Sequence, residues 1–370
     1  WYHPAEGAWL RSSGALQRWE GWATGSNVDR VSGFDDWTPW RAVLDDADPP
    51  FYRWFPGALT NAAFSEVDIH VLEGRGGQLA YVEEPDPLVD GDEGARVTRA
   101  EILARSATAA QELRRGHDLA LGDRVLLFLP TSIEQIVWIE ACKRAGIIYS
   151  CCSPGLPAEQ LASRVAVLGA RLVITADHPE WSFCVHRALG SPACGSPGRG
   201  SENATPLSAD HLRADSFAGD WRGRGVEVLI LDTIRVPKNE LQARLPPPPV
   251  MVPTRVLAAL PGGWAKPPEG PEGVAEVWRS CGSPAPLEAS DPLFVIFTSG
   301  TTGRPKGIVH SHAYVAGLVE TMRTVFAADA AADRMLTIGT LGWITGQSYQ
   351  VSAVLACGIT AVLMRGSPVR

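Results

Sequence analysis

The segment from Thr298 to Gly307 carries residue types that could bind phosphate. It opens with six consecutive Thr, Ser or Gly residues and continues with Arg304 and Lys306 on either side of a proline. Small side chains let backbone N–H groups approach a ligand closely, and N–H groups, hydroxyls and a cation are the donors that a polyphosphate needs. The segment is not a Walker A loop, because no Gly-Lys-Ser/Thr closes it. The sequence therefore predicts a phosphate-binding loop, and a flexible surface linker is the alternative.

The elements that would position this loop read as buried strands and helices. Leu293–Phe297, directly before the loop, is an unbroken apolar run typical of a strand buried on both faces. Upstream, strands are predicted at Arg124–Leu129, Ile147–Cys152 and Arg171–Thr175, with helical patterns between them. This alternation predicts an α/β fold with a mainly parallel, doubly wound sheet.

Two capping boxes mark where helices of this fold should begin. Thr98 with Glu101 would open a helix that runs to about Arg115, and Thr131 with Glu134 would open a second one. Each pair has the spacing at which a hydroxyl and a carboxylate cap the first turn.

The chain divides into regions of different composition. Residues 1–60 are rich in Trp and Pro and predict an irregular arm, with an aromatic binding platform as the alternative. Residues 61–370 would form the large domain, interrupted at about 185–290 by a Gly/Pro-rich stretch that predicts a surface insert. Its proline run at 246–249 suits a loop spacer or, alternatively, an SH3-type ligand.

Composition excludes several classes of protein. The net charge is −8 with acids and bases interspersed, which gives no indication of nucleic acid or membrane partners, and no apolar run approaches a membrane span. Seven cysteines, with no Cys-x-x-Cys pair, favour free thiols in a reducing compartment, so we expect a cytoplasmic protein. No metal site is predicted: His310 and His312 lack a third ligand nearby, so packing roles are favoured over metal binding.

Two strings resemble one enzyme family. TSGTTGRPKG at 298–307 resembles the phosphate-binding loop of the adenylate-forming enzymes, which include AMP-forming acyl-CoA synthetases, adenylation domains and luciferases. GWITGQSY at 342–349 is similar to the acyl-pocket segment of their short-chain branch, that of acetyl- and propionyl-CoA synthetases and the ligase part of propionyl-CoA synthase. The resemblance implies the large N-terminal domain of such an enzyme, and it covers roughly residues 50–370.

The family resemblance implies a reaction and a set of site residues. A short-chain acid (acetate, propionate or 3-hydroxypropionate) would be activated with ATP and Mg²⁺ to an acyl-adenylate and then to its CoA thioester. Lys306 and Thr298 would act catalytically by stabilising the pyrophosphate that leaves. The implied nucleotide contacts are Thr298, Ser299, Gly300, Thr301, Thr302, Gly303, Lys306 and Gly307. The implied acyl and CoA contacts are Trp343, Ile344, Thr345, Gly346 and Gln347.

Alternatives remain open at this stage. Trp343 would be a pocket wall that shortens the cavity, or else a plain core residue. The family's Tyr-Gly-x-Thr-Glu element and C-terminal lid domain are absent from the sequence, so we expect an N-terminal portion of a ligase that is inactive alone and continuous with further domains of a longer polypeptide. A non-catalytic nucleotide-binding remnant or scaffold, and an adenylation domain that loads a carrier protein, are the rival functions.

Overall fold

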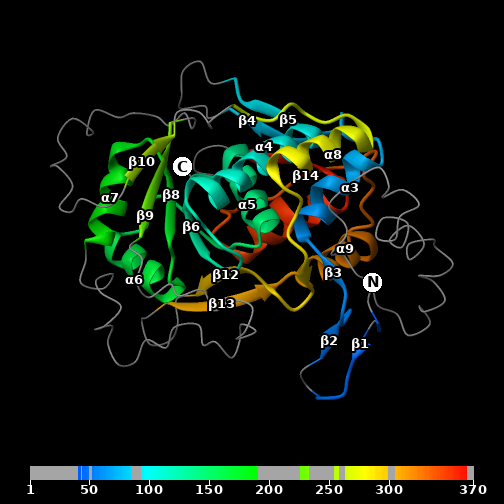
Figure 1. The fold of residues 1–370 in the computed structure, drawn as a ribbon, viewed down its shortest axis with the longest axis horizontal. Coiled ribbons are helices and arrows are strands. Elements are labelled where there is room, and N and C mark those ends of the chain that lie inside the picture. The colour runs from blue at the N-terminus through cyan, green and yellow to red at the C-terminus, as the bar shows by residue number, and fades with distance from the viewer. Residues whose placement is uncertain are drawn as a thin grey trace.

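A seven-stranded sheet forms the centre of the chain in the computed structural model (Figure 1). The structure describes residues 41–42, 44–49, 52–85, 93–190, 226–232, 254–257, 263–298 and 305–364. Across the sheet the strands are β10 (Thr254–Leu257), β9 (Glu227–Leu231), β8 (Leu172–Ala176), β6 (Arg124–Phe128), β7 (Ile148–Cys152), β12 (Pro292–Thr298) and β13 (Lys306–Ser311). The first six run parallel and β13 pairs antiparallel with β12. The predicted mainly parallel sheet is therefore confirmed.

A second sheet of four strands joins the two ends of the described chain. Its order is β14 (Arg334–Leu336), β15 (Thr360–Met364), β4 (Leu79–Glu84) and β5 (Ala95–Thr98). β15 lies parallel to both of its neighbours, and β5 is antiparallel to β4. Two small antiparallel pairs complete the sheets: β1 (Leu44–Asp45) with β2 (Arg53–Trp54), and β3 (Leu59–Thr60) with β11 (Leu287–Glu288).

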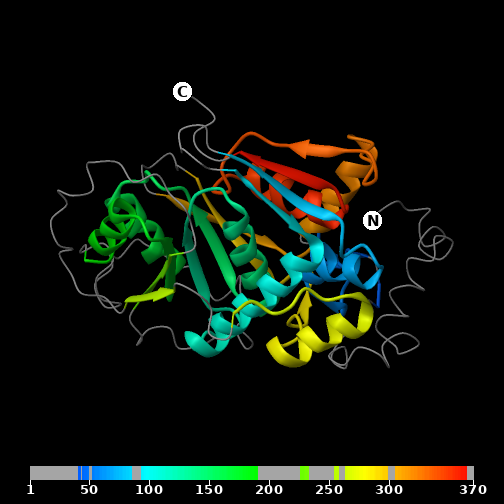
Figure 2. The same cartoon turned by 90° about the horizontal axis from the view of Figure 1, so that it is seen from above.

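Helices cover both faces of the large sheet. In Figure 2, α6 and α7 lie on one side of it and α4 and α5 on the other, toward the four-stranded sheet. The helices are α3 (Ile69–Leu72), α4 (Arg99–Gln111), α5 (Ile133–Ala145), α6 (Ala158–Leu168), α7 (Pro179–Leu189), α8 (Gly270–Cys281), α9 (Tyr314–Thr324), α10 (Ile344–Gly346) and α11 (Ala353–Ala356), with π-helical turns η2 (Phe64–Asp68), η3 (Glu112–Gly116) and η7 (Gln347–Ser352). None of these described helices has the length and apolar character that crossing a membrane demands.

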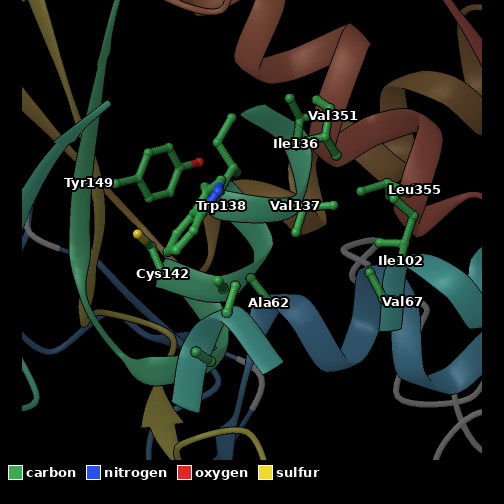
Figure 3. Packing of buried hydrophobic residues seen from close by; sticks show 14 of the residues in the cluster. Ala62, Val67, Ile102, Ile136, Val137, Trp138, Cys142, Tyr149, Val351 and Leu355 are labelled. Carbon is green, nitrogen blue, oxygen red and sulfur yellow. The ribbon is translucent and has the colours of Figure 1, made fainter. Parts of the chain in front are cut away.

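The strands send alternate residues to two separate cores. On β12, Phe294 and Ile296 join the core on the α5 side, whereas Val295 joins the core under α6 and α7 and Phe297 packs against it. The same alternation runs along β6 and β7 because successive side chains of a strand point to opposite faces. Figure 3 shows the α5 side, where Trp138 lies close to Tyr149. Neighbouring residues of one strand near the loop can therefore pack into different cores, on opposite faces of the sheet.

The two predicted capping boxes have different outcomes. Thr98 and Glu101 form the predicted reciprocal box at the start of α4. At α5 the cap is Ser132, whose hydroxyl accepts from the N–H of Gln135, so the predicted Thr131–Glu134 box is wrong by one residue. The Glu134 carboxylate instead accepts a hydrogen bond from the indole of Trp138, which lies one turn further along the helix.

The stretch predicted as a surface insert supplies core elements. β9, where the sequence pattern predicts a strand at 226–231, extends the large sheet together with β10. α8 buries Val274 and Trp278 against the core on the α5 side. The structure therefore differs from the expected surface insert. The Pro and Gly residues lie in and around regular elements of this stretch and do not prevent them from forming. The proline run at 246–249 and most of the predicted arm, including Trp9, lie outside the described residues.

A group of five fully buried charged residues, which we call the buried charge cluster, ties α5 to the N-terminal turn η2. Lys143 donates to Glu66 and, over 2.8 Å, to Glu140, and the Nη1 of Arg144 donates to Asp68 over 2.9 Å. Burial raises the pKa of Glu140 to about 8, although Lys143 opposes the rise. The cluster therefore places two cations among three buried carboxyl groups, those of Glu66, Asp68 and Glu140.

Hydrogen bonds with two other elements complete the buried charge cluster. The indole of Trp278 on α8 donates to Asp68 over 2.8 Å, and Lys143 also donates to Ser352 of η7. His312 lies nearby, where its Nδ1 accepts from the N–H of Ala62. Burial, with a contribution from Lys143, lowers the pKa of His312 to about 3, so the ring is neutral. The cluster is thus a scaffold that joins distant parts of the chain.

Candidate functional site

The predicted phosphate loop joins two paired strands. β12 ends at Thr298 and β13 begins at Lys306, and these two residues lie opposite each other with Thr298 Oγ1 3.5 Å from the carbonyl oxygen of Lys306. The buried strand predicted at 293–297 is confirmed, since it lies between β7 and β13 and leads into the loop. The loop positions Ser299, Gly300, Thr301, Thr302 and Gly303 lie outside the described residues.

Both described ends of the loop face solvent. Thr298 and Lys306 are exposed, and Lys306 forms no ion pair with the described residues. β13 is an edge strand, which leaves the side chain of Lys306 at the rim of the sheet. Its ammonium group is therefore available to a ligand carrying negative charge.

Gly307 has a packing role beside this rim. A Cβ atom at Gly307 would lie 3.0 Å from Val295 Cγ1 and 3.5 Å from the ring of Phe297. A larger residue would push β13 away from β12 at the mouth of the loop. Gly307 thus holds Lys306 close to Thr298.

The second predicted site segment lies at the carboxyl end of β7. A Cβ atom at Gly342 would meet the carbonyl oxygen of Cys151 at 3.3 Å, and one at Gly346 would lie only 2.3 Å from the carbonyl oxygen of Thr340. These glycines let the segment fold tightly against the strand. β7 and β12 are parallel neighbours, so the segment and the loop lie at the same edge of the sheet.

The five predicted acyl and CoA contacts divide into two groups. Trp343 is 71% exposed, which excludes the alternative that it is a core residue. Ile344 and Thr345 are also exposed, whereas Gly346 and Gln347 are buried. Three of the five side chains are therefore presented to solvent near the edge, and the other two belong to the support beneath them.

Gln347 anchors this segment to the sheet. Its Oε1 accepts from the hydroxyl of Tyr149 over 2.8 Å, and its Nε2 donates to the carbonyl of Leu341 over 2.6 Å. The same Nε2 lies 3.4 Å from Cys151 Sγ. The side chain expected to line a pocket is therefore satisfied by protein groups, and it fixes the turn that carries Trp343.

An aromatic group connects the loop hairpin to the same segment. Phe294 of β12 packs against Tyr149, stacks on His310 at 4.7 Å and meets Tyr314 edge-on at 5.4 Å. The hydroxyl of Tyr314 shares a hydrogen bond with Ser348, whose own hydroxyl donates to the carbonyl of Ile344 over 2.7 Å. The loop hairpin and the segment 342–349 are thus connected by packed aromatic rings and hydrogen bonds.

The sequence did not single out Tyr149 and Tyr314. Burial raises the pKa of both phenols, so both remain protonated and can donate. The available signal was weak, since Tyr149 reads only as part of an apolar strand and Tyr314 directly precedes the helical stripe that begins at Val315. His310 stacks in this group and burial lowers its pKa, which gives it the packing role favoured above.

Residues 72–370 match the AMP-binding enzyme family. The chain is 34% identical over 332 residues to an acetyl-coenzyme A synthetase of Methylobacillus flagellatus, an alignment that covers 90% of this chain and 43% of that protein. It is 32% identical over 334 residues to the acetyl-coenzyme A synthetase of Mycobacterium tuberculosis, covering 90% of this chain and 44% of the relative. The protein of that name from Burkholderia thailandensis is 31% identical over 333 residues, with 89% and 43% covered. The chain spans less than half the length of these relatives.

Proposed function

The chain belongs to the AMP-binding enzyme family, and on this premise we propose that it activates a short-chain carboxylic acid with ATP as part of an AMP-forming acyl-CoA ligase. The observation that carries the proposal is the hairpin at the sheet edge, which holds Lys306 opposite Thr298 without a carboxylate partner among the described residues. A cation in this position is suited to a ligand with several negative charges.

In the proposed first step, a carboxylate oxygen of the acid attacks the α-phosphorus of ATP. A bond forms between that oxygen and phosphorus, the bond to the β-phosphoryl oxygen breaks, and pyrophosphate leaves with the electron pair. Lys306 and the Thr298 hydroxyl would stabilise the charge that builds on the pyrophosphate, together with the loop residues 299–303. ATP would bring Mg²⁺ with it as part of the substrate, which supplies further charge neutralisation.

In the proposed second step, the sulfur of CoA bonds to the carbonyl carbon of the acyl-adenylate and its thiol proton passes to solvent. The bond between that carbon and the phosphate oxygen breaks, and AMP leaves with the electron pair. The exposed side chains Trp343, Ile344 and Thr345 would contact the acyl group and the incoming thiol. The large indole of Trp343 would shorten the cavity, which favours acids of two to three carbons. Within that range, the GWITGQSY string and the HSHAYVAG string at 310–317 would favour propionate or 3-hydroxypropionate over acetate.

The test is to measure pyrophosphate–ATP exchange in the natural full-length polypeptide with acetate, propionate, 3-hydroxypropionate and hexanoate. We expect exchange with the three short acids and little with hexanoate. Lys306→Ala should slow the exchange about a hundredfold, because the leaving group loses its cation. Exchange that is absent with every acid, or equal in the variant, would overturn the proposal.

A further inference from the structure

One arginine reaches the loop edge from the opposite face of the sheet. Arg164 lies on α6 and is half-buried, with its Nη1 3.3 Å from Cys152 Sγ. The central carbon of its guanidinium lies 5.5 Å from the ring centroid of Phe297. Cys152 is the last residue of β7 and Phe297 directly precedes Thr298, so the guanidinium lies beside the carboxyl ends of both strands.

The partners of Arg164 are weak for a charged group. A thiol sulfur is a poor hydrogen-bond acceptor, and an aromatic ring offers about 0.5–1 kcal/mol to a cation at such a site. The Nε of Arg164 is buried and has no hydrogen-bond partner among the described residues, and none of the described carboxylates forms an ion pair with the side chain. A half-buried cation is stabilised by an anion, so a phosphate or carboxylate that reached this guanidinium would be bound favourably.

The neighbouring helix provides a contrast. Arg187 on α7 pairs with Glu159 over 2.7 Å, and both side chains are more than half exposed. Arg171, which precedes β8, pairs with Asp123. Arg187 and Arg171, which lie away from the loop, therefore have carboxylate partners, whereas Arg164 has none among the described residues.

The position of Arg164 complements that of Lys306. Phe297, whose ring Arg164 covers, pairs with Gly307 across the hairpin. Gly307 directly follows Lys306, so Arg164 and Lys306 lie near the same end of the hairpin. GWITGQSY packs against the same strand ends from the α5 side, while Arg164 approaches from the α6 side. In open α/β sheets, ligands bind at the carboxyl ends of the strands, which is where these groups converge.

We propose that Arg164 is a second anion-binding residue of this edge and binds a phosphoryl group of a substrate. The ligand class rests on the proposed function, but the role of Arg164 does not follow from it. Two substrates carry such a group, ATP and CoA, and the guanidinium can bind either one through paired N–H donors. Binding would give the guanidinium, whose Nη1 contacts Cys152 Sγ, an anionic partner.

The test is calorimetric titration of the natural full-length polypeptide and its variants with pyrophosphate, ATP and CoA as separate probes. Arg164→Gln should weaken at least one probe tenfold or more, and Arg164→Lys should recover part of the loss, because lysine keeps the charge but not the paired donors. Arg187→Gln is the matched control and should stay within twofold. Thermal unfolding of each variant checks that the fold is kept.

The three probes separate the two sources of phosphate. If Arg164→Gln and Lys306→Ala both weaken pyrophosphate and ATP, Arg164 binds the nucleotide. If Arg164→Gln weakens CoA alone, it binds the coenzyme. Unchanged binding of all three probes in Arg164→Gln, with pyrophosphate lost in Lys306→Ala, would show that Arg164 only packs on Phe297 and would leave the proposed function standing. A wild-type protein that binds none of the probes would overturn both proposals.

Discussion

Two lysines of this chain illustrate opposite uses of a positive charge. Lys143 is completely buried and donates to two carboxylates and a serine, whereas Lys306 is exposed and has no ion-pair partner among the described residues. A buried charge requires partners within the protein because removing one partner leaves the other uncompensated. The comparison teaches that, among the described residues, the buried charge cluster belongs to the scaffold, whereas the candidate site is marked by an exposed cation without an ion pair.

Breaking the scaffold side of this comparison should give the largest effect. Lys143→Ala leaves the Glu66 carboxylate buried without its cation, so we expect the free energy of unfolding to fall by about 3–5 kcal/mol. Urea denaturation measures this loss. The control is Arg279→Ala, which removes an exposed pair with Glu276 and should cost less than about 1 kcal/mol. Equal losses in the two variants would contradict the distinction.

Breaking the site side should change catalysis and leave stability alone. Lys306→Ala is expected to slow pyrophosphate exchange by about two orders of magnitude, or roughly 2.7 kcal/mol. Its free energy of unfolding should stay within about 0.5 kcal/mol of the wild type, because the side chain is exposed. A large loss of stability in this variant would mean that Lys306 is part of the scaffold after all.

The dependence of stability on pH tests the burial of His312, which lies beside the buried charge cluster. The pKa of His312 is about 3 in the folded protein because of burial, and about 6.5 when unfolded. Below pH 6.5 only the unfolded state takes up this proton, so stability is full above pH 6.5 and is lost as the pH falls toward 3. The expected loss is about 1.4 kcal/mol per pH unit inside that window.

His312→Asn provides the measurement, since it removes the titrating ring and keeps an acceptor for the N–H of Ala62. Urea denaturation at pH 7, 6 and 5 should show a flatter pH dependence in the variant than in the wild type. His70 contributes in the same direction, because burial lowers its pKa to about 3 as well. Parallel curves for variant and wild type would refute the assignment.

The smallest expected effect concerns the support beneath the site. Tyr149→Phe removes the hydroxyl that donates to Gln347, which should cost about 1–2 kcal/mol of stability. Hydrogen exchange should become faster in residues 340–349, where Gln347 fixes the turn. Tyr52→Phe, at a residue 53% exposed, is the matched control and should change neither quantity. Unchanged exchange at 340–349 would show that the turn holds without Tyr149.

The sequence predicted elements whose signal is local. The apolar strands at 124–129, 147–152 and 293–297 and the capping box at Thr98 are found as expected. α8 and β10 escaped prediction because prolines and glycines lie in or beside them, and because their burial depends on distant partners. The four-stranded sheet pairs strands from opposite ends of the chain, which periodicity along the chain does not indicate.

The candidate site was predictable to a similar extent. Thr298 and Lys306 were identified by residue type, but their direct opposition in a hairpin depends on the register of β12 and β13. Gln347 was expected to face a pocket, and only the position of Tyr149 on β7 explains why it is buried. Arg164 has no local signal at all, since its significance lies in Phe297, far along the chain.

The four-stranded sheet also limits the order in which strands can pair while the chain is being translated. Thr360 Oγ1 of β15 donates to the carbonyl of Leu79 on β4 across 281 residues of chain. At roughly 5–20 residues per second, β4 waits roughly 15–60 s for its central neighbour to be synthesised. β6, β7 and β8 lie close together in sequence and can pair long before that. The nascent chain must therefore keep the open edge of β4 from other unpaired strands during translation, and slower synthesis would lengthen that exposure.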